Sequence, residues 1–178
     1  MRRLPHILFA STLFAAVLGA SSVHGFDAQD VPTVFAIRKT NNRNRVDYGI
    51  RLDERCRPRG DDPVVPYWRR LEQGPSVTAG LSTFQHIVYG VSHERIARSE
   101  SGGRVRVRLR ALPERTITIE TEQSGDGCRA KAISTVDGTP ARLVDILVVL
   151  DGPRDVNHVE VTGRAIEDGH FVREMLRR

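Results

Sequence analysis

The sequence has few lysines, few aromatic residues and no long apolar run. Of its 27 basic residues only Lys39 and Lys131 are lysines, and 22 acidic residues nearly balance the charge. Nucleic-acid binding normally needs a concentrated basic surface, so we expect no nucleic-acid partner. The longest apolar stretch falls short of the roughly 20 residues that cross a bilayer. We therefore expect no retained transmembrane segment.

The short motifs of several enzyme classes are also missing. The sequence contains no Gly-rich phosphate loop and no metal signature of paired His or Cys residues. The histidines beyond residue 25 never stand three or four positions apart, so no two of them share one side of a helix. They are His86, His93, His158 and His170. We expect no metal ion and no cofactor, and we assign no catalytic residue.

The N-terminus has the layout of a secretory signal peptide. Arg2 and Arg3 precede an apolar stretch of about 14 residues, which small and polar residues follow. We expect residues 1–25 to be a signal peptide and residues 26–178 to form a single β-rich domain, which is long enough to bury its own core. The mature protein would then be periplasmic or secreted.

Two cysteines, Cys56 and Cys128, are the only ones in the chain. Disulfides persist in the oxidising compartments that exported proteins enter. We therefore expect the two cysteines to form a structural disulfide. A reactive thiol beside a histidine is the alternative, and it would require an unpaired cysteine.

Segments of alternating apolar and polar residues recur along the chain between Gly-containing turns. About nine such segments are present, and two of them, residues 33–40 and 45–52, flank the polar stretch NNRN as in a hairpin. This pattern is typical of an all-β protein, and we expect an antiparallel β-sandwich or barrel of about nine strands.

One segment breaks the alternation and predicts a single short helix. Residues 81–90 show helical spacing of apolar side chains and end in Gly90, which suits the end of a helix. The apolar residues at this spacing are Leu81, Phe84, Ile87 and Val88.

Arginine occupies every second position from Arg104 to Arg110. A bare stripe of this kind would suit a polyanion. With a three-residue turn at 113–115, however, Arg108 would lie opposite Glu120 on the next strand. We favour this second interpretation, a solvated strand face held by cross-strand ion pairs.

The few aromatic residues give a candidate binding site. Tyr67 and Trp68 are adjacent in a predicted strand, so one of them should face outward. We expect an aromatic rim that binds a small ligand or a segment of a partner protein. The candidate residues are Asn42, Asn44, Tyr48, Tyr67, Trp68 and Tyr89. For the two asparagines, turn formation is a sufficient alternative explanation.

The leading hypothesis is therefore an exported, non-catalytic binding or interaction domain of the bacterial envelope. An envelope hydrolase with His86 or His93 as its base is one alternative. It would require two or more of His86, His93, Glu94 and Asp145 to converge in a cleft. A structural protein that pairs an exposed strand edge with a neighbour is the other.

Three stretches of the sequence together resemble a known family. They are FAIRKTNNRNRVDY at 35–48, PVVPYWRRLEQG at 63–74 and LSTFQHIVYGV at 81–91. The chain resembles the bacterial family known as domain of unknown function 4833, in which Asn-x-Asn and a tyrosine precede a Tyr-Trp strand and a helix ending in Tyr-Gly-Val. The resemblance implies an exported β-rich domain and carries over no catalytic residue. The two cysteines and the arginine richness depart from the family pattern.

Overall fold

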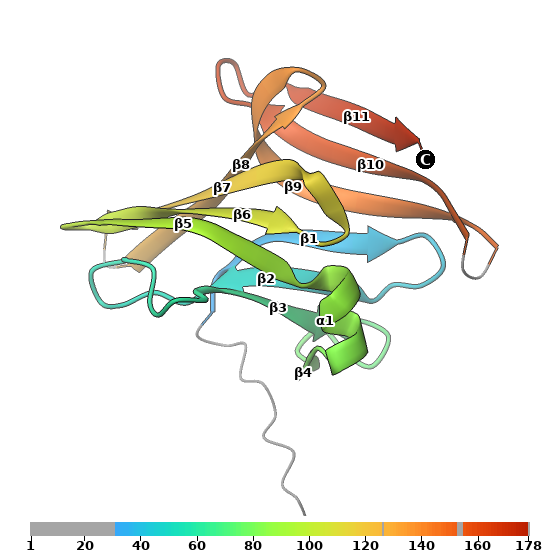
Figure 1. The fold of residues 1–178 in the computed structure, drawn as a ribbon, viewed down its shortest axis with the longest axis horizontal. Coiled ribbons are helices and arrows are strands. Elements are labelled where there is room, and N and C mark those ends of the chain that lie inside the picture. The colour runs from blue at the N-terminus through green and yellow to red at the C-terminus, as the bar shows by residue number, and fades with distance from the viewer. Residues whose placement is uncertain (1–30, 126, 153–154, 178) are drawn as a thin grey trace, which may run out of the picture.

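The computed structural model describes residues 31–125, 127–152 and 155–177, which form eleven strands and one short helix (Figure 1). The predicted signal peptide, residues 1–25, lies outside the described residues. The elements are β1 (Thr33–Lys39), β2 (Arg45–Ile50), β3 (Val64–Arg69), β4 (Thr78–Gly80), α1 (Thr83–Tyr89), β5 (Val91–Ser99), β6 (Gly102–Leu109), β7 (Leu112–Ser124), β8 (Gly127–Val136), β9 (Thr139–Asp151), β10 (Asp155–Ala165) and β11 (Phe171–Arg177).

All eleven strands belong to one mixed sheet, and β9 is its centre because β9 pairs with three other strands. Strand β10 pairs along almost the whole of one edge of β9. On the other edge, residues 139–142 pair with β8 and residues 146–148 pair in parallel with β1. Two leaves therefore start from the same edge of β9. The first leaf is β1 to β4 and the second leaf is β8 to β5.

The hydrophobic core lies between the two leaves. Tyr48 and Ile50 of the first leaf belong to the same buried cluster as Val107 and Ile119 of the second. Each leaf is thus apolar on its inner side, as the two-residue period of the strands requires. Figure 1 shows the second leaf passing over β1, β2 and β3. The core is closed by this packing although the sheet itself is not closed.

The prediction of a mostly β fold with one short helix is confirmed, whereas the antiparallel sandwich or barrel of about nine strands is not. The two additional strands are β4, which has only three residues, and β5. Strand β5 was not predicted because its sequence, VSHERIARS, has apolar residues at too few alternate positions to indicate a strand. The parallel pairing of β1 with β9 joins segments about 110 residues apart, which local periodicity cannot reveal.

Local turn chemistry explains the predicted hairpins. Strands β1 and β2 form the expected antiparallel pair. Strands β8 and β9 are joined at Asp137 and Gly138, which have φ angles of 48° and 74°. Asp-Gly accepts this left-handed backbone, which suits the twist of a two-residue hairpin turn. Pro66 lies just beyond the part of β3 that pairs with β4, where it needs no amide hydrogen.

The arginine stripe of β6 is partly ion-paired, but in a different register from the predicted one. Arg104 lies opposite Glu120, and Arg104 Nη2 is 2.7 Å from Glu120 Oε1. The predicted pairing of Arg108 with Glu120 is wrong, because the chain turns at residues 110–111 and residues 113–115 form a bulge, which places Arg108 opposite Thr116. Arg108 instead pairs with Glu94 of β5, at 2.5 Å. The interpretation as an ion-paired face is therefore confirmed for these two arginines.

Candidate functional site

The asparagines of the β1–β2 connection stabilise a turn. The Asn42 side-chain oxygen accepts a hydrogen bond from the Asn44 amide at 3.0 Å, which is an Asx turn. Asn44 also donates from its side chain to Glu72 at 3.1 Å, and its side-chain oxygen accepts from the Glu72 amide. These contacts tie the turn to the loop between β3 and β4. Turn formation and loop anchoring account for both side chains.

Three of the predicted aromatic residues meet where α1 joins the first leaf. Tyr48 is fully buried, and its hydroxyl donates to the Tyr89 carbonyl oxygen at 2.8 Å. Burial raises the pKa of the Tyr48 hydroxyl, so it stays a donor at any physiological pH. The Trp68 and Tyr89 rings pack edge to face with centroids 5.7 Å apart. The indole N–H of Trp68 is buried and has no acceptor among the described residues.

The apolar side of α1 faces away from the core. Phe84, Ile87 and Val88 are 74%, 60% and 38% exposed, whereas Tyr89 at the end of the helix is buried. Residues three and four positions apart share one side of a helix, so these three form a continuous apolar stripe. A capping box between Ser82 and the side chain of the third helical residue fixes the start of the helix. Helical spacing was thus predicted, but not the direction of the stripe.

Two cations lie near the C-terminal end of α1. The Lys39 Nζ atom is 5.3 Å from the centre of the Tyr89 ring, within the range of a cation–π contact. The Arg110 side chain lies against Gly90, the residue that caps the helix. Positive charge near a helix C-terminus is favourable because the helix dipole is negative there. The apolar stripe is therefore bordered at one end by positive charge.

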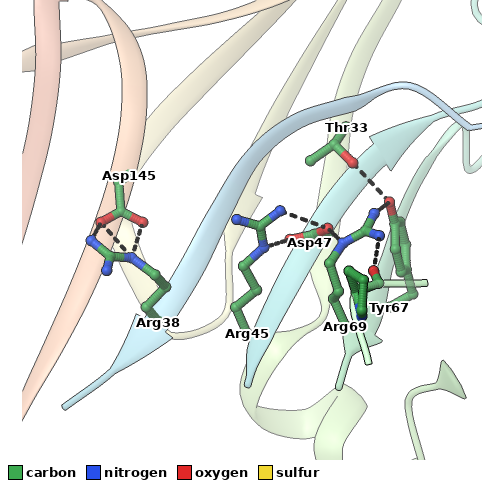
Figure 2. Close-up of polar contacts among 8 residues, drawn as sticks. Thr33, Arg38, Arg45, Asp47, Tyr67, Arg69 and Asp145 are labelled. Carbon is green, nitrogen blue, oxygen red and sulfur yellow. Dashed lines mark hydrogen bonds and ion pairs between the residues drawn. The ribbon is translucent and has the colours of Figure 1, made fainter. Parts of the chain in front are cut away.

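The fourth predicted aromatic residue, Tyr67, lies on the opposite face of the first leaf and belongs to a buried polar network (Figure 2). At its centre is Asp47, whose side chain has no exposed surface. Arg69 Nε donates to one Asp47 oxygen at 2.5 Å, and Arg45 Nε lies 2.6 Å from the other. Arg69 also donates to the Tyr67 hydroxyl, which lies 2.8 Å from the Thr33 hydroxyl. The hydrogen bond to Asp47 raises the pKa of Arg69.

A second arginine–aspartate pair lies beside this network, across the parallel junction of β1 and β9 (Figure 2). The Arg38 Nε atom is 3.0 Å from both Asp145 oxygens, and the Nη2 atom also contacts Asp145. Arg38 is 49% exposed, so water screens this pair far more than the one around Asp47. Asp47 is engaged by two arginines and Asp145 by one, so neither aspartate is a free carboxylate for acid–base chemistry.

Three of the four residues of the hydrolase hypothesis, His93, Glu94 and Asp145, each contact different partners. His93 Nε2 accepts a hydrogen bond from the Val64 amide at 3.2 Å and thereby links the two leaves. Its Nδ1 atom is 3.0 Å from an Asp62 carboxylate oxygen. Burial lowers the pKa of His93, against the opposing effect of Asp62. Glu94 pairs with Arg108 and Asp145 with Arg38, while His86 is exposed on α1.

The disulfide between Cys56 and Cys128 is present, as predicted. It joins the loop that follows β2 to the beginning of β8, with Cα atoms 5.3 Å apart. The disulfide therefore crosslinks the first leaf to the second, since β2 and β8 belong to different leaves. Asp53 accepts hydrogen bonds from two amides of the same loop, which lowers its pKa together with the contact of the Arg57 side chain.

The described residues contain no group of three or more His, Cys, Asp or Glu side chains placed to hold a metal ion. The helix within that part of the chain is too short and too polar to span a membrane. Among the hollows on the described surface are two that no aromatic residue lines. One lies over the Cys56 loop and is lined by Leu52 and by charged residues between 53 and 59. The other lies over β7 to β10.

Sequence reasoning missed two features that matter for function. Asp47 lies between Val46 and Tyr48 in the strand RVDYGI, and an acidic residue flanked in this way could have signalled a buried ion pair. The outward direction of the α1 stripe had no local signal, because periodicity defines a stripe but not what it faces.

Comparison with known proteins places the chain in a family. Neither the curated proteins nor the solved structures include a match to it. A family model matches residues 35–175, which span both leaves, the helix and the whole of the central strand. The chain therefore belongs to the family described as Domain of unknown function (DUF4833).

Proposed function

We propose that this chain is an exported, non-catalytic interaction domain of the bacterial envelope that docks to a partner protein through α1. The outward stripe of Phe84, Ile87 and Val88 carries the proposal. Apolar side chains that are exposed together mark interaction surfaces more often than isolated ones do. The spacing i, i+3 and i+4 is also the one by which a helix inserts its anchors into the apolar groove of a partner.

The shape of the surface favours a protein over a small ligand as the occupant. The helix lies at the periphery, beside the ends of β3 and β4 (Figure 1). A stripe on the outer side of a helix is convex, whereas small molecules bind in concave sites. The partner must therefore supply the groove.

The charges around the helix define the chemistry of that groove. Lys39 and Arg110 border the C-terminal end of α1. Complementary charges across an interface steer association and suppress wrong partners. The partner groove is thus apolar at its floor and acidic at the rim that meets these cations.

The location expected from the sequence fits the same proposal. The predicted signal peptide and the disulfide between Cys56 and Cys128 are both compatible with an oxidising compartment outside the cytoplasm. Partners of the domain would then be periplasmic, secreted or envelope proteins.

Photo-crosslinking in the producing bacterium tests the proposal. A photoreactive phenylalanine analogue replaces Phe84 in one variant and Met175, which is 49% exposed on β11, in a control variant. We expect a crosslinked species of defined mass from position 84 and none of that mass from position 175. Adding Ile87→Ser to the first variant should abolish the product, because the stripe loses its second anchor.

The identity of the crosslinked product decides between the possible occupants. A partner with an apolar, acid-rimmed groove would support the proposal. A second copy of the chain, a lipid or no product would overturn it.

A small ligand at the aromatic cluster is a second candidate, which the unpartnered indole N–H of Trp68 favours. A ligand with an acceptor group would satisfy that donor and stack near Tyr89, while Tyr48, whose hydroxyl donates to the Tyr89 carbonyl oxygen, would support the site from within the fold. Native mass spectrometry of the gently purified protein tests this candidate. A mass excess that disappears on unfolding would support it. A native mass equal to that of the chain alone, together with Trp68 fluorescence that does not change when lipid is gently removed, would reject it.

A further inference from the structure

A hollow of about 440 Å³ opens on the outer face of the sheet, away from α1. Its walls come from β7, β8, β9 and β10, and its volume lies within the range of small-molecule sites. The apolar lining residues are Ile133, Ala165 and Ile166. They give the hollow an apolar wall beside its charged groups.

The charged lining of the hollow is mainly positive. Lys131, Arg142 and Arg164 are cationic and Glu120 alone is acidic, so three positive charges and one negative charge leave a net charge of +2. Glu120 is itself bound at 3.3 Å by Lys131 and at 2.7 Å by Arg104, which lies outside the hollow. Arg142 and Arg164 therefore line the hollow without a carboxylate partner there, because Glu120 is already engaged by Lys131 and Arg104.

The positions of these two arginines make them a matched pair. Arg142 of β9 and Arg164 of β10 are directly opposite each other in the strand register. Like charges directly opposite across two strands repel each other and destabilise the pair. No hydrogen bond or ion pair engages the Arg142 side chain within the described part of the chain. An anion placed between the two guanidinium groups would relieve the repulsion.

Arg164 is held in place before any ligand arrives. Its guanidinium carbon lies 3.9 Å from the centre of the Phe171 ring, and its Nη1 atom donates to the Gly169 carbonyl oxygen at 3.2 Å. A guanidinium fixed by stacking loses less conformational entropy when it binds an oxyanion. The remaining N–H groups stay available for a carboxylate or phosphate.

We propose that this hollow binds a small organic anion, with its carboxylate or phosphate group between Arg142 and Arg164 and its apolar part against Ile133 and Ile166. The site is separate from the docking helix, so either proposal can fail without the other. Two planar guanidinium groups match the geometry of these oxyanions, and the apolar wall distinguishes an organic anion from an inorganic one.

Calorimetric titration of the purified mature chain tests the site with three probes. Phenyl phosphate carries both the anion and the apolar part, inorganic phosphate carries only the anion, and benzyl alcohol carries only the apolar part. We expect saturable binding of phenyl phosphate, weaker binding of inorganic phosphate and no binding of benzyl alcohol. Absence of saturable phenyl phosphate binding would overturn the proposal, as would equal binding of benzyl alcohol.

Matched substitutions then locate the binding. Arg142→Gln and Arg164→Gln should each weaken phenyl phosphate binding about tenfold, the usual effect of losing one charge-assisted hydrogen bond. Arg70→Gln removes the same charge from an exposed position on the first leaf and should leave the affinity unchanged. Equal losses in Arg142→Gln and Arg70→Gln would mean that only net charge matters, and would overturn the proposal.

A stability measurement provides an independent readout. At low ionic strength and without phosphate, Arg142→Gln should raise the thermal midpoint, because it removes a like charge directly opposite Arg164 in the strand register. Addition of phenyl phosphate should raise the midpoint of the unmodified chain but not that of the variant. A lower midpoint for the variant without phosphate would contradict the inferred repulsion.

Discussion

Removal of the Asp47 charge should be far more costly than removal of the Asp145 charge, although each aspartate pairs with arginine. The substitutions Asp47→Asn and Asp145→Asn change the same atoms on neighbouring parts of one sheet face (Figure 2). Asp47 is completely buried between two arginines, whereas Asp145 pairs with a half-exposed one. The comparison therefore isolates the effect of burial.

The expected magnitudes follow from desolvation. Removing one partner of a buried ion pair costs about 3–5 kcal/mol, because it leaves a charge without compensation. We expect about 3 kcal/mol for Asp47→Asn, since Arg45 and Arg69 are partly exposed and can still reach water. An exposed pair contributes about 0.5–1 kcal/mol at most, and this is the expected loss for Asp145→Asn.

Urea unfolding of the mature chain at neutral pH measures both losses. With a slope of about 2 kcal/mol per molar urea, Asp47→Asn should lower the midpoint by about 1.5 M and Asp145→Asn by about 0.5 M or less. High salt should reduce the loss at Asp145 and leave the loss at Asp47 almost unchanged, because buried pairs are screened less. Equal losses for the two variants, or a salt-sensitive loss at Asp47, would refute the reasoning.

Two further predictions concern the contacts that join the leaves. Replacing Cys56 and Cys128 by alanine opens a loop closed over a sequence separation of 72, and should lower the free energy of unfolding by about 4 kcal/mol on the chain-entropy model. A loss of less than about 1 kcal/mol in the free energy of unfolding, measured by heat or urea, would contradict a stabilising role for this crosslink between the leaves. Because burial lowers the folded-state pKa of His93, the unfolded chain binds protons more readily, and stability should fall as the pH drops below the unfolded value of 6.5. His93→Gln should flatten this part of the stability profile, since protonation removes the acceptor of the Val64 amide; an unchanged slope would show that other groups cause it.

Local patterns predicted the parts of the fold that depend on local chemistry. The hairpin of β1 and β2 followed from two alternating segments around an Asx turn, and the Asp137–Gly138 turn followed from its Asp-Gly sequence. The disulfide followed from the number of cysteines and the expected compartment.

The arrangement of the two leaves depends on contacts that no local pattern encodes. The second half of β9 pairs with β1 instead of β8, so one strand serves both leaves. Mixed pairing of this kind depends on how the inner faces of the leaves pack against each other. The register of β6 and β7 was missed because the hairpin turns at residues 110–111 and bulges at residues 113–115, whereas a regular three-residue turn at 113–115 was expected.

The candidate site shows the same division between local and global information. In the structure Tyr48 and Trp68 both contact Tyr89, and the sequence had proposed these three residues as part of one candidate rim. It could not show that the neighbouring apolar residues of α1 point to solvent. That direction depends on Tyr89 occupying the space against the first leaf, which is a tertiary contact.

The affinity of the crosslinked partner for matched variants tests the central proposal most directly. Phe84→Ser combined with Ile87→Ser removes two exposed anchors, while Met175→Ser removes an apolar side chain of comparable exposure on β11. A buried apolar side chain contributes about 1.5–3 kcal/mol, so the double variant should bind the partner at least about tenfold more weakly. The control variant should bind as the unmodified chain does. Equal affinities for all three proteins, measured by calorimetry, would contradict docking through α1.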